Sequence, residues 1–231
     1  MVLFCANSNQ LTQMGKTKDI KVNEDGTCTF TFKDDACGEN GNFDPGANQV
    51  GLKIDGMARA SLLLSQRFFS LLEKEGITTH FISADVERGT MTCHKLAMLP
   101  VEFIWRDKAW GSFCKMYGVE QGYPLNGLVE ATLKSDALGD PRINKEACVG
   151  LGKLTESQYD HCDTFIRKIG RTLKQELEKY GYNLIDFKVE FGINDKGHVL
   201  LADEISGGIW RLLDKDGKSV DPVECAKKIC G

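Results

Sequence analysis

Two apolar segments late in the 231-residue chain carry acidic residues at spacings that could do chemistry. In LIDFKVEF, residues 184–191, apolar and polar residues alternate, so Asp186, Lys188 and Glu190 share one face of a predicted strand. A second apolar run follows and contains Asp203 near its end. Such carboxylates suit Mg²⁺, which takes one or two of them and completes its shell with water and phosphate oxygens. A solvated strand face, with Lys188 as a surface ion-pair partner, explains the same spacing.

Basic residues elsewhere could bind phosphate groups. Lys16 and Lys18 in GKTK would share a strand face and could hold a polyphosphate, although the spacing is not that of a Walker A loop. Arg106 and Ser112 in RDKAWGS could bind a phosphomonoester. Lys134 opens LKSDALGDPRIN, where the Asp-Pro pair also fits plain turn chemistry. Taken alone, a pair of surface lysines explains GKTK better, and each of the other motifs is weak by itself. No nucleophile stands beside a base.

Composition excludes several classes of protein. The formal net charge of −4 gives no basic surface for nucleic acid, and no run of 18 apolar residues predicts a membrane span. The first residues, MVLFCANSNQ, lack the basic and apolar regions of a signal peptide. Nine scattered cysteines without a C-x-x-C motif predict neither a zinc site nor a disulfide framework. We expect reduced thiols in a cytoplasmic protein.

The first half of the chain reads as strands around one helix. Residues 15–33 predict a β-hairpin with its turn at NEDG. The turn-rich residues 34–51 predict a structureless functional loop. A helix is expected from about Asp55 to a stop at Gly76. Further strands are expected in THFISAD and in TCHKLAMLPVEFIWRD.

The second half is similarly mixed. Thr155 with Gln158 predicts a capping box that opens a long amphipathic helix, up to about Tyr180. The two acidic strands follow, joined at NDKG. This order favours an α+β fold. A boundary near Pro100 divides it into a β-rich nucleotide-binding lobe, residues 1–98, and an α+β lobe with the metal and substrate sites, residues 99–231.

The order of the motifs from about Gly15 to Arg211 resembles the SAICAR synthetase family. The resemblance rests on GKTK, FKDD before an Asn-Gly pair, GITTHFI, KLAMLPVE, RDKAWGS, LKSDALGDPRI, IDFKVEFG and DEIS. It implies an ATP-grasp-like fold of two α+β parts with ATP between them. It also implies an ATP-dependent ligase that joins carboxyaminoimidazole ribonucleotide (CAIR) to L-aspartate, through an acyl phosphate, giving SAICAR, ADP and phosphate in purine biosynthesis.

The resemblance also implies roles for the candidate residues on the nucleotide side. ATP would be bound through its phosphates by lysines and through adenine by the segment near residue 98, and Mg²⁺ by two acids. The residues with these roles are Lys16, Lys18 and Lys134 for the phosphates, Lys95 and Met98 for adenine, and Glu190 and Asp203 for the metal and nucleotide. Lys18, Asp186 and Lys188 are expected to take part in catalysis, with Asp186 beside the metal.

On the substrate side, the resemblance implies that Arg106, Ser112 and Arg211 bind the 5′-phosphate end of CAIR. Asp35 and Asn40 would reach the substrate from a mobile loop, residues 33–41. The partners implied are small molecules, with no nucleic acid and no membrane, and a homodimer is compatible with this picture.

Two positions depart from the family's usual pattern. Gly207 and Gly208 stand where Pro-Asp is usual, and Trp210 precedes Arg211. Met57 replaces a usual lysine. These departures leave two interpretations open: a variant with unchanged activity, or a paralogous ATP-dependent ligase that joins a different acid or amine.

Overall fold

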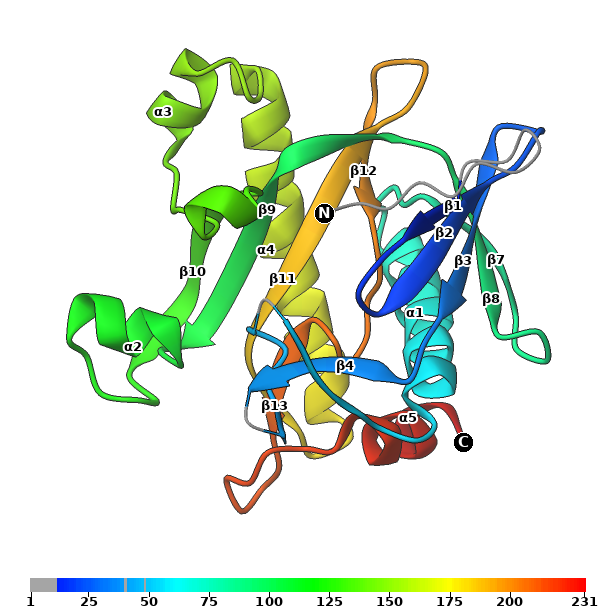
Figure 1. Ribbon diagram of the computed structural model, residues 1–231. Helices are drawn as coiled ribbons and strands as arrows, with labels where there is room; N and C mark the ends of the chain where they lie inside the picture. The colour runs from blue at the N-terminus through cyan, green and yellow to red at the C-terminus, as the bar shows by residue number, and fades with distance from the viewer. Residues whose placement is uncertain (1–11, 40, 48) are drawn as a thin grey trace.

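The computed structural model in Figure 1 describes residues 12–39, 41–47 and 49–231. The N-terminal segment interpreted as lacking a signal peptide, and the predicted substrate residue Asn40, lie outside these residues. The chain folds into three sheets and several helices, which confirms the predicted α+β class. The proposed division between residues 98 and 99 stays a prediction.

Five antiparallel strands form the N-terminal sheet, in the order β1-β2-β3-β8-β7. Residues 18 to 22 pair with residues 32 to 28, so the predicted hairpin is confirmed. Cys28, Phe30 and Phe32 alternate inward along its second strand, as a half-buried strand requires. The bounds are β1 Thr12–Met14, β2 Lys18–Val22, β3 Thr27–Phe32, β7 Phe81–Asp85 and β8 Thr90–His94.

Helix α1, Met57–Lys74, packs against this sheet. It ends before Gly76, whose φ of +78° is left-handed, so the predicted stop is confirmed. Asp34 Oδ1 accepts a hydrogen bond from the backbone N–H of Ala58, 2.9 Å away, and thereby satisfies one of the free donors at the start of the helix.

The segment predicted to be structureless instead forms a small antiparallel sheet. Its strands are β4 Asp35–Glu39, β5 Asn42–Phe43 and β6 Val50–Lys53, in the order β5-β4-β6. That prediction was wrong because the residues that face inward on β4 are Ala36 and Gly38, which give no hydrophobic alternation in the sequence. The sheet leaves its loops short, and one of them carries Asp44.

The central sheet has the order β10-β9-β11-β12, and β13 also pairs with β11. All these pairs are antiparallel, as the two acidic strands were predicted to be. Strand β9 runs through Pro100. The bounds are β9 Ala97–Lys108, β10 Pro124–Leu133, β11 Asn183–Ile193, β12 Val199–Ala202 and β13 Trp210–Leu213.

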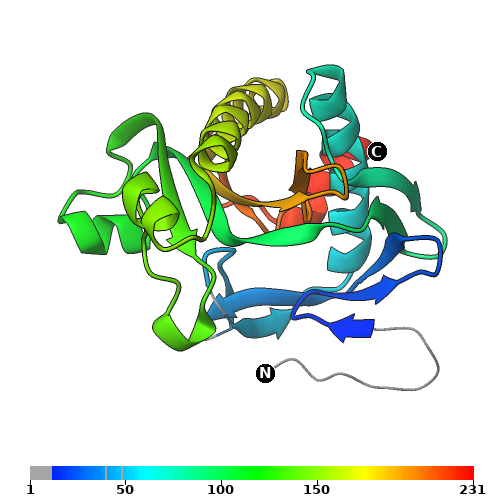
Figure 2. The same ribbon diagram turned by 90° about the horizontal axis from the view of Figure 1, so that it is seen from above.

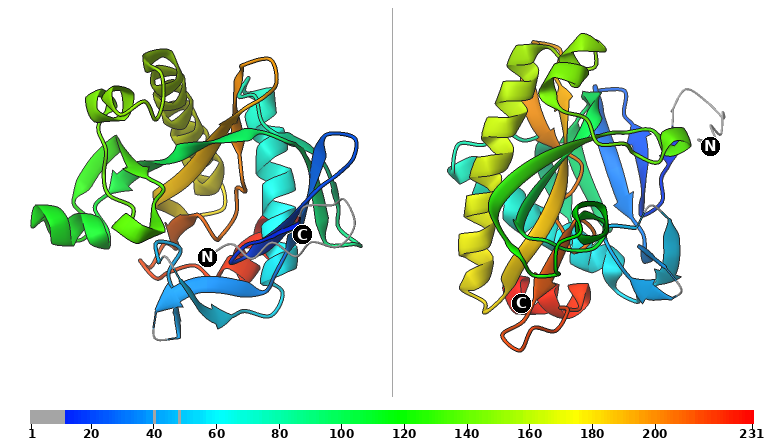
Figure 3. Two further views of the ribbon diagram at one scale, coloured as in Figure 1. Left: turned by 45° about the horizontal axis from the view of Figure 1, so that its top comes forward. Right: turned by 90° about the vertical axis from the view of Figure 1, so that its left-hand side faces the viewer.

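The remaining helices flank the central sheet. Helix α4, Glu156–Glu178, begins with the predicted capping box of Thr155 and Gln158. In Figures 2 and 3 this helix covers one face of the sheet, and β4 crosses the opposite face. The others are α2 Ser112–Tyr117, the 3₁₀ turn Asp136–Leu138, α3 Lys145–Gly150 and α5 Pro222–Cys230. The polar residues of β11 therefore face the side on which β4 lies.

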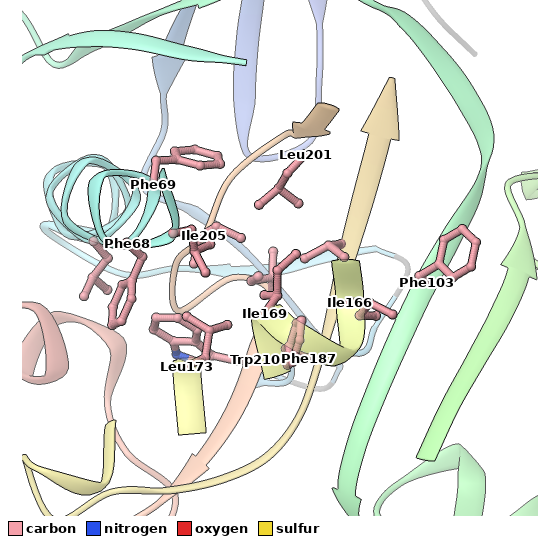
Figure 4. Packing of buried hydrophobic residues seen from close by; sticks show 14 of the residues in the cluster. Phe68, Phe69, Phe103, Ile166, Ile169, Leu173, Phe187, Leu201, Ile205 and Trp210 are labelled. Carbon is pink, nitrogen blue, oxygen red and sulfur yellow. The ribbon is translucent and has the colours of Figure 1, made fainter. Parts of the chain in front are cut away.

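A continuous apolar core joins α1, α4 and the central sheet (Figure 4). Phe68 of α1 meets Trp210 of β13 edge to face, with ring centroids 5.2 Å apart. Phe187 of β11 points into the same core. Each such side chain contributes about 1.5–3 kcal/mol by burial. In the described part of the chain, no helix is long and apolar enough to cross a membrane.

Candidate active site

Lys18, the first residue of β2, lies at the centre of a cluster of charges. Its side chain is only 11% exposed, and its Nζ lies 2.9 Å from Asp203 Oδ1 and 2.5 Å from Glu204 Oε1. Although burial favours the neutral amine, the two carboxylates raise the pKa of Lys18 above its ordinary value. Lys18 is therefore a fixed cation that ties the N-terminal sheet to the end of β12, and it suits the charge of a bound phosphate.

The backbone at Asp203 explains how two consecutive acids reach one lysine. Side chains of neighbouring strand residues point to opposite faces. Strand β12 ends at Ala202, and Asp203 adopts a left-handed φ of +65°, so Asp203 and Glu204 both turn toward Lys18. Despite burial, Lys18 lowers the pKa of Asp203 below its usual range. Glu204 was not among the residues predicted from the sequence.

His80 supports the same turn from the N-terminal side. Its Nε2 lies 3.0 Å from the backbone carbonyl oxygen of Asp203. Burial lowers the pKa of His80 to about 4, so the ring is neutral near pH 7 and Nε2 carries the proton that it donates. In the sequence, His80 was noted only as part of the motif GITTHFI and was given no role.

Glu190 and Asp203 lie side by side, as predicted. Glu190 pairs in register with Ala202, the residue before Asp203, and its carboxylate is bound by Lys134. Burial and then the nearby Asp203 raise the pKa of Glu190, while Lys134 opposes this shift. Two carboxylates that repel each other are a fitting place for a divalent cation.

The number of acids also fits a magnesium ion shared with phosphate. Among the residues that the structure describes, no group of three or more His, Cys, Asp or Glu could hold a metal. Mg²⁺ usually takes one or two carboxylates and fills its other positions with water and substrate phosphates. Glu190 and Asp203 can therefore hold Mg²⁺ only if phosphate oxygens and water fill its other coordination positions.

Lys188 shares the polar face of β11 with Glu190. Its Nζ lies 3.3 Å from Glu102 Oε1. Burial favours the neutral amine, but Glu102 raises the pKa of Lys188 above its ordinary value. Lys16 lies in the exposed turn before β2. The prediction that it shares a strand face with Lys18 was therefore wrong. The charges of Lys188 and Lys16 both act on the Cys37 thiol of β4, whose pKa is raised by burial.

A buried row of arginines and acids crosses the other end of the face. Arg106 of β9 binds Glu130 Oε2 at 2.7 Å and Asp186 Oδ2 at 2.6 Å. Arg211 of β13 places Nη1 3.1 and 2.9 Å from the two oxygens of Asp186. The row follows from register, because Asp186 pairs with Arg106 on one side and Arg211 on the other. Asp186 thus lies with the arginines, away from the Glu190–Asp203 pair.

The predicted phosphate-binding residues come together only in part. Gly111, which precedes Ser112, lies so close to Arg211 that an added Cβ would be 3.3 Å from Nη2. Ser112 is exposed and begins α2. Arg106 is only 4% exposed and its guanidinium already binds two acids, so little of it is left to contact a ligand directly.

The adenine-side residues lie where β8 passes into β9. Met98 is 48% exposed on β9, and Gly192 of β11 lies opposite it. An added Cβ at Gly192 would meet Leu96 at 2.7 Å and Met98 Sδ at 3.2 Å. The absence of a side chain at 192 therefore leaves room for these two apolar side chains. A hollow of about 810 Å³ opens beside Lys95, but its lining includes neither Lys18 nor Met98. The hollow therefore does not include the charge cluster around Lys18.

Asp35 lies on β4, 3.9 Å from Lys53 Nζ, on the sheet that replaces the predicted loop. The next turn of that sheet brings in Asp44, which the sequence did not single out. Its Oδ1 accepts hydrogen bonds from Arg211 Nε at 3.1 Å and Nη2 at 2.9 Å. Only the fold could bring residue 44 to residue 211.

The departures from the family pattern lie at Glu204, at α5 and at the start of α1. A Cβ on Gly207 would stand 2.5 Å from Pro222 Cβ of α5, whereas one on Gly208 would make ordinary contacts of 3.5 Å with Glu204 and Ser206. Met57 is buried at the start of α1. The close packing of the C-terminal helix α5 therefore explains why position 207 is a glycine.

The chain matches known proteins over nearly its whole length. Residues 11–228 match the family model described as SAICAR synthetase. The phosphoribosylaminoimidazole-succinocarboxamide synthase of Clostridium tetani is 46% identical over 220 residues, covering 93% of this chain and 96% of that protein. The Finegoldia magna protein of the same name is 38% identical and covers 87% and 84%. A solved SAICAR synthetase in complex with ADP superposes with a TM-score of 0.84 at 33% identity, covering 94% of this chain and 95% of that one.

Proposed function

Because the chain belongs to the SAICAR synthetase family, we propose that the cluster around Lys18 binds ATP and that the arginines around Asp186 bind the ribonucleotide substrate. The protein is an ATP-dependent ligase, a phosphoribosylaminoimidazole-succinocarboxamide synthase of purine biosynthesis. It joins CAIR and L-aspartate. The alternative of a paralogous ligase for another acid or amine is not needed, because relatives that match almost the whole chain carry this name.

The observation that carries the residue assignment is the position of Lys18 between Asp203 and Glu204. Phosphoryl transfer needs charge neutralisation and in-line positioning more than it needs an acid or base. Lys18, with Lys134 and the exposed Lys16, would neutralise the phosphates of ATP. Glu190 and Asp203 would hold Mg²⁺, which would draw charge from the phosphate oxygens when bound.

The proposed reaction proceeds in two displacements. A carboxylate oxygen of CAIR attacks the γ-phosphorus, the bond from that phosphorus to the bridging oxygen breaks, and ADP leaves with the electron pair. The amine of aspartate then attacks the acyl carbon of the acyl phosphate. The carbon–oxygen bond breaks, inorganic phosphate leaves, and the amine loses a proton to give the amide. Lys188, held protonated beside Glu102, faces the same side of β11 and would stabilise negative charge there.

The remaining roles complete the proposal. Met98 and the backbone near Lys95 would line the adenine pocket, and the exposure of Met98 supports this. Arg211, with Ser112 nearby, would hold the 5′-phosphate end of CAIR, and Asp35 would approach the substrate from β4. A homodimer stays a prediction that sedimentation would check.

ADP release tests the proposal, with ATP, Mg²⁺, CAIR and L-aspartate each omitted in turn. We expect ADP only when all four are present. Asp203→Asn should lower turnover by about 100-fold or more, because one of the two carboxylates that would hold Mg²⁺ is lost, and with it the cation's stabilisation of the reacting phosphate. The Mg²⁺ concentration needed for half-maximal turnover should rise. Asp216→Asn, an exposed acid in the turn after β13, is the control. Full turnover in Asp203→Asn would refute the metal assignment.

A further inference from the structure

The guanidinium of Arg211 is shared between two carboxylates. Nη1 lies 2.9 and 3.1 Å from the oxygens of Asp186. Nε and Nη2 lie 3.1 and 2.9 Å from Asp44 Oδ1, an edge-on arrangement like that of a bound phosphate oxygen. In this state, the edge of Arg211 that an incoming anion would use is already taken.

The two carboxylates differ in how firmly they are held. The Asp186 side chain is 4% exposed, and Arg106 binds it as well. The Asp44 side chain is 46% exposed and lies in the turn between β5 and β6. An exposed ion pair contributes little, about 0–1 kcal/mol. Asp186 is therefore a permanent partner of Arg211, whereas Asp44 can be exchanged for another anion at small cost.

The charges of the row point to an anion as the replacement. Ion pairs connect three guanidinium groups with three carboxylates, and Asp44 is the most exposed of these acids. If Asp44 leaves, the row carries one net positive charge, facing the place that Asp44 occupied. The connected groups are Arg106, Arg142 and Arg211 with Asp186, Glu130 and Asp44.

Two glycines lie against the guanidinium of Arg211. A Cβ on Gly46 would overlap the guanidinium of Arg211, and one on Gly111 would lie 3.3 Å from Nη2. At both positions backbone without a side chain faces the guanidinium. A group larger than a carboxylate can approach Arg211 from this side once the Asp44 turn has moved.

We propose that Asp44 is an autoinhibitory residue whose carboxylate occupies on Arg211 the place of the substrate's phosphate group, so that the substrate binds by displacing it. This inference rests on the proposed function, in which Arg211 holds the phosphate end of CAIR. A phosphate monoester carries about two charges near pH 7 and displaces a carboxylate readily. A nucleoside without the phosphate does not compete for this place, so Asp44 weakens the binding of the phosphorylated substrate alone.

The test is a steady-state comparison of full-length wild type with Asp44→Asn and Asp44→Ala. The KM for CAIR should fall about two- to fivefold, since the competing carboxylate no longer lowers the fraction of binding-competent protein. The KM for ATP should not change. The inhibition constant of inorganic phosphate, used as a direct probe of the arginine, should fall with the KM for CAIR. With the dephosphorylated nucleoside as substrate, the variants should show no gain.

Asp85→Asn is the matched control, since Asp85 is also 46% exposed and pairs with an arginine, Arg88, away from the site. It should leave every constant unchanged. An unchanged or raised KM for CAIR in Asp44→Asn overturns the inference, a raised value meaning that Asp44 helps to hold substrate. Arg211→Met separates the two proposals. If it leaves the KM for CAIR unchanged, the phosphate assignment itself fails. If it raises that KM while Asp44→Asn does not lower it, only the inference fails.

Discussion

The ring of His80 and the backbone of Asp203 are joined by one hydrogen bond of 3.0 Å, from Nε2 to the carbonyl oxygen. The bond links the start of β7 to the end of β12, at the residue whose left-handed φ lets two acids face Lys18. A left-handed aspartate costs on the order of 1 kcal/mol and persists only where its surroundings hold it. His80 is therefore a positioning residue for the acid turn.

The buried histidine makes stability depend on pH. Its pKa is about 4 in the folded protein and 6.5 ordinarily, so between these values the unfolded chain binds a proton that the folded chain does not. The free energy of unfolding should fall as pH falls, by about 2 kcal/mol between pH 7.5 and 5. Urea unfolding at the two pH values measures this. His80→Gln should remove most of the difference, whereas the exposed His198→Gln should keep it.

Lys18 should be essential for stability as well as for turnover. Lys18→Met leaves Asp203 and Glu204 buried without their cation, which should cost about 3–5 kcal/mol in the free energy of unfolding. Lys18→Met with Glu204→Gln removes one of the stranded charges and should recover part of that loss. Urea unfolding and ADP release together check this, because both variants should remain inactive. A Lys18→Met protein as stable as wild type would contradict the buried pairing.

How far the sequence predicts this site depends on the range of the interactions. The polar face of Asp186, Lys188 and Glu190 was predicted correctly, because alternation along one strand is a local property. The pairing of Asp186 with Arg106 and Arg211 depends on the register of three strands, which no local pattern contains. Glu204 was missed because regular alternation would point it away from Asp203.

The small sheet of residues 35–53 shows the same limit in the fold. Its strands are short and built around glycine, alanine and turn residues, so local propensity indicates a loop. The hairpin of β2 and β3 and the capping box of α4 were predictable because their signals lie within a few residues. Contacts such as Asp44 with Arg211 arise only from tertiary structure.

Glu102 should set the alkaline limit of activity through Lys188. Burial pulls the pKa of Lys188 down, and Glu102, 3.3 Å away, holds it above its ordinary value. Glu102→Gln leaves burial with less opposition, so Lys188 should lose its proton at lower pH. The alkaline limb of kcat should then move to lower pH while turnover at pH 7 changes less. An alkaline limb at the wild-type position would show that the charge of Lys188 is not needed.

Gly207 should be required by the packing of α5. An alanine at 207 would bring its Cβ within 2.5 Å of Pro222 Cβ, whereas one at 208 meets nothing closer than 3.5 Å. Gly207→Ala should therefore lower the free energy of unfolding by about 1–3 kcal/mol, as overpacking does. Gly208→Ala, the neighbouring control, should change the free energy of unfolding much less.

A double variant identifies the cause. Pro222→Gly removes the atom that clashes, so Gly207→Ala should cost clearly less in that background than in wild type, and urea unfolding of the four proteins measures this coupling. The same cost in both backgrounds would mean that α5 does not explain the glycine. With the coupling present, the proline usual in the family cannot fit at 207 while α5 keeps its position. The departure at 207 then reflects how the C-terminal helix packs and needs no change of substrate.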